Sequence, residues 1–142
     1  MVPWSRQLFH ERLHGTMDLS PNGTYAVWWD NQELAWYGRA VDGGQATSLT
    51  ASMTYPVHNE DHDWPYRPNA YGTAGWTEDD GEFLVYDRYD IWALDPAGQR
   101  LPRSITEGVG RRENLRFRYV DLDRENETIA SDQPMTLSVF NT

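Results

Sequence analysis

Short apolar runs separated by polar turns follow one another along most of the chain, and their arrangement repeats. The first repeat opens with the turn 20–23, continues through the apolar runs 25–29 and 34–41, and ends on a shorter run, 47–50. Successive side chains of a strand point to opposite faces, and in 25–29 both faces are apolar. We therefore predict an antiparallel sheet over this repeat that is covered on both sides.

A second repeat has nearly the same length and the same order of features. It predicts strands at 74–77, 82–86 and 89–94 and a short one near 104–106, with a turn at 78–81. A third unit starts with 115–120 and ends with 135–140. Repeated antiparallel sheets of this size are typical of the blades of β-propellers.

These patterns predict an all-β fold in a single domain, 1–142, which forms part of a β-propeller. We expect two to three antiparallel propeller-like blades at about 17–50, 74–106 and 115–142, and a long loop between blades at 51–73. Propellers close with four to eight blades, so two or three would leave strand edges unpaired. We therefore expect self-association, in which exposed edges of several copies pair to form a homo-oligomer. The only helical pattern lies at 5–14.

Composition narrows the classes of partner. The 12 basic and 22 acidic side chains give a net charge of −10, which argues against nucleic acid as a partner. No apolar run is long enough to cross a bilayer, so we expect no membrane insertion. The absence of cysteine excludes disulfides and thiolate chemistry but leaves the cellular compartment open.

Five stretches, 19–23, 71–80, 86–92, 117–123 and 137–141, resemble the propeller of the prolyl oligopeptidase family of serine peptidases, in its dipeptidyl-peptidase-like branch. The resemblance implies an exported or periplasmic parent whose propeller gates the access of peptides to a separate α/β-hydrolase domain. That domain is missing here, because no serine lies in a Gly-x-Ser-x-Gly elbow and no histidine follows His62. We therefore expect a noncatalytic segment that acts as a scaffold, a substrate gate or a protein- or peptide-binding module, without a cofactor.

A zinc-dependent peptidase is the alternative from another functional class. His10, Glu11 and His14 satisfy the His-Glu-x-x-His pattern, which on a helix supplies two zinc ligands and a general base. Glu33 stands where a third ligand could follow, although its surroundings predict a hairpin turn rather than a second helix. The acidic, histidine-containing run 58–63 is a weaker candidate for a bound metal.

A third alternative is a carbohydrate- or peptide-binding module with an aromatic platform. Trp64, Tyr66 and Trp76 are the candidates, because sugars and peptides often stack on aromatic side chains. The competing interpretation places most tryptophans in the core between blades, where large apolar side chains are usually buried.

The segment 87–90 has the composition of a charged hairpin turn on the surface. It contains Arg88 between two acidic residues that flank the turn. We expect Arg88 to pair with one of these neighbours, an exposed interaction that adds little stability.

Overall fold

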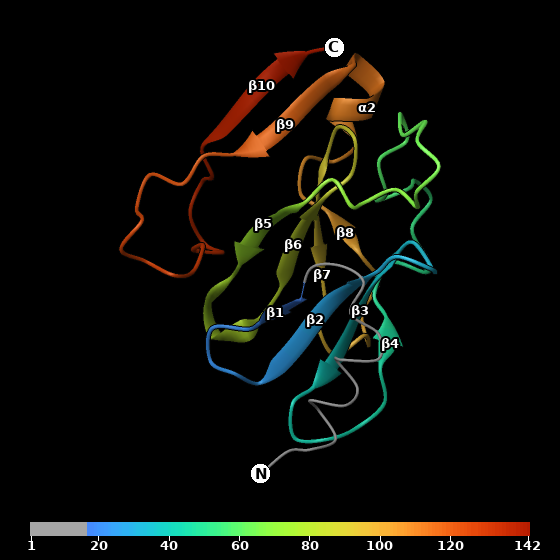
Figure 1. Cartoon of the computed structure of the whole chain (residues 1–142). Helices are drawn as coiled ribbons and strands as arrows, with labels where there is room; N and C mark the ends of the chain where they lie inside the picture. Colours follow the sequence, from blue (N-terminus) through green and yellow to red (C-terminus); the bar gives the residue numbers. More distant parts are fainter. Residues whose placement is uncertain (1–16) are drawn as a thin grey trace.

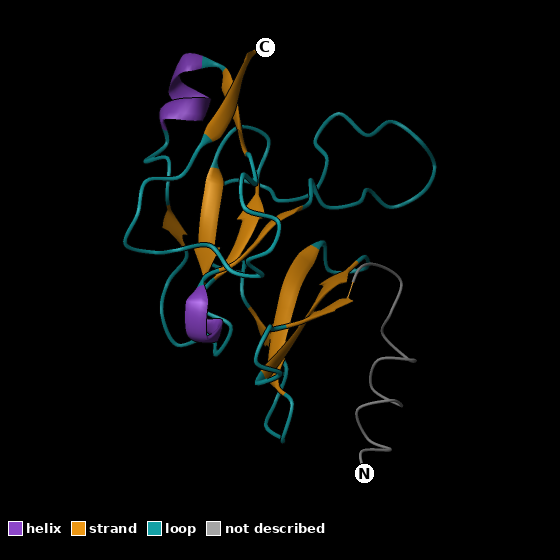
Figure 2. Cartoon of the chain, turned by 90° about the vertical axis from the view of Figure 1, so that its left-hand side faces the viewer, coloured by secondary structure: helices purple, strands orange, loops and turns teal. Residues whose placement is uncertain are grey.

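The computed structural model describes residues 17–142, and β-strands make up most of their regular structure (Figure 1). Figure 2 shows that the helical elements are short. The elements in chain order are β1 (Met17–Leu19), β2 (Tyr25–Asp30), β3 (Ala35–Ala40), β4 (Thr47–Ser48), β5 (Thr73–Trp76), η1 (Glu78–Asp80), β6 (Phe83–Tyr86), β7 (Ile91–Leu94), β8 (Arg103–Ser104), α2 (Val109–Glu113), β9 (Leu115–Tyr119) and β10 (Leu137–Asn141).

The first repeat folds as predicted into one antiparallel sheet with the strand order β1-β2-β3-β4. Trp29 pairs with Trp36 across β2 and β3. The β1–β2 turn closes when Gly23 N–H donates to Ser20 O over 2.8 Å. Gly23 has a φ of 76°, a value that favours glycine and explains why the turn ends there.

The second repeat forms a second antiparallel sheet with the corresponding order β5-β6-β7-β8. The prediction of an all-β chain is thereby confirmed for residues 17–142. The sequence predicted that this strand begins at residue 89, but β7 begins at Ile91. The reason is that the Asp87 carboxylate accepts hydrogen bonds from Tyr89 N–H and Asp90 N–H over 2.7 and 2.6 Å, which holds this segment in a turn.

The two four-stranded sheets pack face to face around a shared core. The Phe83 ring of the second sheet lies 5.2 Å from the Trp36 ring of the first and 4.9 Å from Trp76, measured between centroids. Between the sheets the backbones also approach closely: a Cβ on Gly38 would lie 2.9 Å from Pro96 O. The buried members of this core are Val27, Trp29, Trp36, Leu49, Val57, Trp76, Phe83, Val85 and Leu94.

Equivalent turns of the two sheets are joined by one buried carboxylate. Asp80, which is only 4% exposed, accepts hydrogen bonds from Ser20 Oγ over 2.6 Å and from Asn22 N–H over 2.9 Å. Thr24 N–H donates to the same carboxylate over 3.3 Å. The β5–β6 turn is thus fixed against the β1–β2 turn.

The opposite face of the second sheet is also covered, so this sheet forms a middle layer. Leu84, Tyr86, Ile91, Ala93 and Ile129 form a second buried cluster there. Partly buried side chains of β9 and β10 pack against this cluster, and Figure 1 shows these two strands at one end of the molecule beside α2. They make a two-stranded sheet, and none of the three sheets closes on itself within residues 17–142.

Candidate functional site

The long segment between the first two sheets, predicted as the loop 51–73, is an ordered loop held at its base. Val57 is buried in the shared core. Above it Tyr71 N–H donates to Val57 O over 3.2 Å, and Asn59 N–H donates to Asn69 O over 2.8 Å. These bonds make a narrow stem whose tip, residues 60–68, projects from the sheets. β5 begins at Thr73, so the loop ends one residue earlier than predicted.

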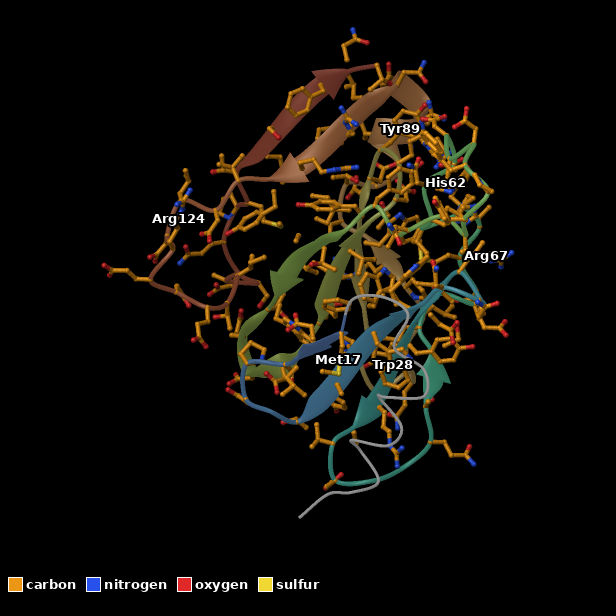
Figure 3. The ribbon with its side chains drawn as sticks, viewed as in Figure 1. Met17, Trp28, His62, Arg67, Tyr89 and Arg124 are labelled. Carbon is orange, nitrogen blue, oxygen red and sulfur yellow. The ribbon has the colours of Figure 1, made fainter. Side chains whose placement is uncertain are left out.

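Hydrogen bonds within the tip and to a neighbouring turn fix its shape. The His62 ring lies 2.7 Å from Tyr66 O, and Nε2–H donates because the carbonyl can only accept. The Arg67 guanidinium donates to Gln32 O over 2.5 Å and to Asn31 O over 3.3 Å in the β2–β3 turn. In Figure 3 the labelled His62, Arg67 and Tyr89 lie on one side of the molecule, opposite Arg124.

Arg111, from α2, joins the loop to the second sheet. Its guanidinium lies over the Tyr55 ring, 4.0 Å from the centroid, and 5.1 Å from that of Tyr89. Nη2 lies 3.4 Å from a Glu60 carboxylate oxygen and 3.7 Å from one of Asp87. Two aromatic faces and two carboxylates therefore surround the Arg111 guanidinium. This environment suits a planar guanidinium better than an ammonium group.

Asp90 holds α2 in the position from which Arg111 reaches the loop. Its buried carboxylate accepts hydrogen bonds from Thr106 Oγ over 2.6 Å, from Gly110 N–H over 2.8 Å and from Arg111 N–H over 3.1 Å. The N-cap of α2 is Gly108, which has no side chain to make these bonds. A side chain at residue 110 would collide with Asp90, because a Cβ there would lie 2.7 Å from Oδ1.

The prediction that 87–90 is an exposed turn with a local ion pair is wrong. Asp87 and Asp90 are buried, at 0% and 2% exposure. Arg88 instead pairs with Asp61 of the loop over 3.3 Å. Asp90 accepts hydrogen bonds from Thr106 and α2, and Asp87 accepts them from its own turn and from Trp92, so both buried carboxylates have polar partners. The local sequence carried no sign of the contacts with Thr106 and α2.

Removing the Arg111 guanidinium is expected to loosen the loop. Arg111→Met keeps most of the apolar stem of the side chain but leaves Glu60 and Asp87 without their cation. We expect a cost of about 1–2 kcal/mol, because Glu60 is partly exposed and the buried Asp87 keeps its hydrogen bonds from the turn and from Trp92. Hydrogen exchange at the stem amides of Asn59 and Tyr71 should accelerate about tenfold. Arg112→Met, on the exposed side of the same helix, is the control, and equal protection in both variants would contradict this role.

Burial of the Tyr71 side chain raises the pKa of its hydroxyl above the ordinary value. That hydroxyl accepts a hydrogen bond from Glu60 N–H over 2.8 Å and lies 3.4 Å from a Glu60 carboxylate oxygen. It therefore stays protonated over the neutral pH range and serves as another fixed point between the stem and the tip.

The three residues proposed for an aromatic platform do not lie together. Trp64 and Tyr66 are both in the loop tip and are 70% and 75% exposed. Trp76 is 4% exposed, packs on Phe83 in the shared core, and donates from Nε1 to Asp18 over 3.2 Å. The aromatic surface therefore consists of Trp64 and Tyr66, whereas Trp76 belongs to the interior with Trp28, Trp29 and Trp36, as the core interpretation predicted.

The zinc hypothesis falls largely on residues outside those that the structure describes. His10, Glu11 and His14 lie there, so the hypothesis stays a prediction. Glu33 is exposed in the β2–β3 turn, where its N–H donates to Asp30 Oδ1 over 3.0 Å. No group of three His, Asp or Glu side chains suited to a metal ion, the run 58–63 included, occurs within residues 17–142.

Neither α2 nor the turn η1, which together are the helical elements of residues 17–142, has the length and apolar character needed to span a membrane.

Comparison of the chain with models of protein families, with curated proteins and with solved structures found no match.

Proposed function

We propose that this chain forms successive blades of a β-propeller and serves as a noncatalytic scaffold. Three features support this. The two repeats have the same antiparallel strand order, they pack face to face, and the second is covered on its outer face by a third unit. The relation to the prolyl oligopeptidase family, with a role in gating peptide access and an exported parent, remains part of this proposal and rests on the sequence resemblance.

The scaffold displays the loop 51–72 as a binding element for a peptide or protein. The observation that carries this is the exposure of Trp64 and Tyr66, at 70% and 75%, on a loop that is fixed by Arg67, Arg111 and the stem. Large aromatic side chains held in place on the surface contribute contact area at little entropic cost, as in other recognition surfaces. The side chains of a disordered loop would lose conformational entropy on binding, which these fixed side chains do not.

Charge around the aromatic pair favours a basic partner. Asp63 precedes Trp64 in the tip and is exposed. Asp61 is also exposed but pairs with Arg88, and Arg67 is the only arginine or lysine side chain of the tip, 60–68, against three acidic ones. The whole chain carries a net charge of −10. Aromatic faces also accept the rings of extended proline-rich segments and the cationic groups of arginine. We therefore propose an extended segment that contains arginine and proline as the preferred partner.

Titration calorimetry with a short peptide of alternating arginine and proline tests this proposal. Trp64→Ala and Tyr66→Ala should each weaken binding about tenfold, the effect expected for one stacked aromatic side chain, without a change in unfolding free energy. Leu122→Ala is a matched control, because Leu122 is 75% exposed on a different loop. Equal binding of a peptide of alternating aspartate and proline, or unchanged affinity in both aromatic variants, would contradict the proposal.

We also propose that β10 mediates self-association. β10 pairs only with β9 among the described strands, and its Val139 and Phe140 are 50% and 51% exposed. The strand carries no charged side chain, and an edge of this kind favours pairing with another strand. Light scattering should show a mass that rises with concentration. A constant monomer mass up to millimolar concentration would contradict this assembly.

A further inference from the structure

A cleft lies between the outer face of the second sheet and the segment that carries β9 and β10. Its volume is about 440 Å³, within the range of about 300–1,000 Å³ of small-molecule sites. None of its lining residues belongs to the loop 51–72, so it is separate from the proposed peptide site. Its apolar lining includes Met135, Leu84 of β6, Phe117 of β9 and Leu137 of β10.

A charged pair borders this apolar surface. Arg103 Nη2 donates to Glu82 Oε1 over 2.7 Å, and both residues line the cleft. A guanidinium has five N–H donors and a carboxylate has several acceptor sites, so this single bond leaves capacity on both groups. The Arg103 side chain is 61% exposed and that of Glu82 is 19% exposed. The Arg103 cation is therefore accessible to a ligand, and the Glu82 carboxylate is the more enclosed of the two charges.

We infer that this cleft binds a free hydrophobic α-amino acid. The apolar side chain of the ligand would lie on Leu84, Phe117 and Met135. Its ammonium group would pair with Glu82 and its carboxylate with Arg103, since the two ligand charges are as close together as the two protein charges. A hydrocarbon ligand would contact only the apolar lining. A ligand with only a negative or only a positive charge would pair with only one of Arg103 and Glu82.

The ligand tests use L-phenylalanine and two analogues, each of which lacks one charge. Nuclear magnetic resonance titration should show saturable shifts at Leu84, Phe117 and Met135 with phenylalanine. Phenethylamine, without the carboxylate, and 3-phenylpropionate, without the ammonium group, should each bind about tenfold more weakly. Equal affinity of either analogue, or no shifts with phenylalanine up to its solubility limit, would overturn the proposal.

The protein tests remove one charge at a time. Arg103→Met should weaken phenylalanine binding about tenfold and abolish the preference over 3-phenylpropionate. The control is Arg100→Met, because Arg100 is similarly exposed but pairs with Asp95 outside the cleft. Met135→Trp should block the cleft, whereas Trp64→Ala should leave it unaffected, which separates this site from the loop. Unchanged affinity in both Arg103→Met and Met135→Trp would overturn the assignment.

Discussion

Replacing Asp80 with asparagine is expected to lower the free energy of unfolding by about 2–3 kcal/mol. The carboxylate accepts hydrogen bonds from Ser20 Oγ, Asn22 N–H and Thr24 N–H, and hydrogen bonds to a buried charged group stabilise by about 1.5–3 kcal/mol. An asparagine keeps the shape and tolerates the left-handed backbone of this residue, which has a φ of 54°. However, the amide NH2 of asparagine replaces one of the two carboxylate oxygens, both of which accept hydrogen bonds. A donor would then face the donor that this oxygen accepts from. Chemical denaturation measures the loss.

The neighbouring Asp79 offers a matched control for this substitution. Asp79 also has a left-handed backbone, with a φ of 59°, but it is exposed. Asp79→Asn should therefore change the unfolding free energy by no more than about 0.5 kcal/mol. If both variants behaved alike, the hydrogen bonds of Asp80 would not be what joins the two turns.

The effect of Asp80 should also depend on pH. Burial raises the pKa of its carboxyl, but the hydrogen bonds from Ser20, Asn22 and Thr24 outweigh burial and leave the pKa below its ordinary value. A group with a lowered pKa in the folded state stabilises the protein above its unfolded pKa, about 3.9 for Asp, and loses this effect as the pH falls through the folded pKa. The difference between wild type and Asp80→Asn should therefore shrink below about pH 4.

Truncating Phe83 is expected to have the largest effect on stability. Phe83 is 0% exposed and its ring contacts Trp36 of the first sheet and Trp76 of the second. Loss of a buried aromatic ring costs about 3–5 kcal/mol, because the transfer free energy is lost and a cavity remains. Phe83→Ala should therefore lower the unfolding free energy by that amount, as measured by denaturation with urea.

Phe140 provides the comparison for the same change of side chain at the surface. It is 51% exposed on β10, so Phe140→Ala should cost less than about 1 kcal/mol when measured at a concentration at which the chain is monomeric. If Phe83→Ala fails to fold, Phe83→Leu, which conserves more volume, should still cost about 1–1.5 kcal/mol. A loss no larger than that of Phe140→Ala would show that the core between the sheets does not hold them together.

The strands could be predicted from sequence because their signal is local. The run 25–29 in β2 is apolar on both faces, which is typical of a strand in a covered sheet, and the segment with Gly23 and the one with Gly81 marked the turns before β2 and β6. These features depend on near neighbours in the chain. The face-to-face packing followed from runs that are apolar on both faces.

The features that build the site could not be predicted because their partners are distant in sequence. Asp87 and Asp90 have the composition of a surface turn. The distant partners that accompany their burial are Thr106 and α2, which donate to Asp90, and Arg111 of α2, which lies 3.7 Å from the Asp87 carboxylate. The helix α2 has five residues, too few for a periodic pattern, and takes its cap from Asp90. The sequence placed Trp64 in a loop and Trp76 in a strand, but the aromatic platform grouped them. Only the packing of Trp76 on Phe83 in the shared core shows that its ring is buried while that of Trp64 is exposed.

The two repeats stack face to face, with the ring of Trp36 against that of Phe83. Nuclear Overhauser effects between the protons of these two side chains test this arrangement, because the 5.2 Å between ring centroids brings ring protons well within range. We predict strong cross-peaks between Trp36 and Phe83, which are 47 residues apart (83 − 36). A folded protein that shows cross-peaks within each sheet but none between these two rings would contradict the stacked arrangement and the scaffold role built on it.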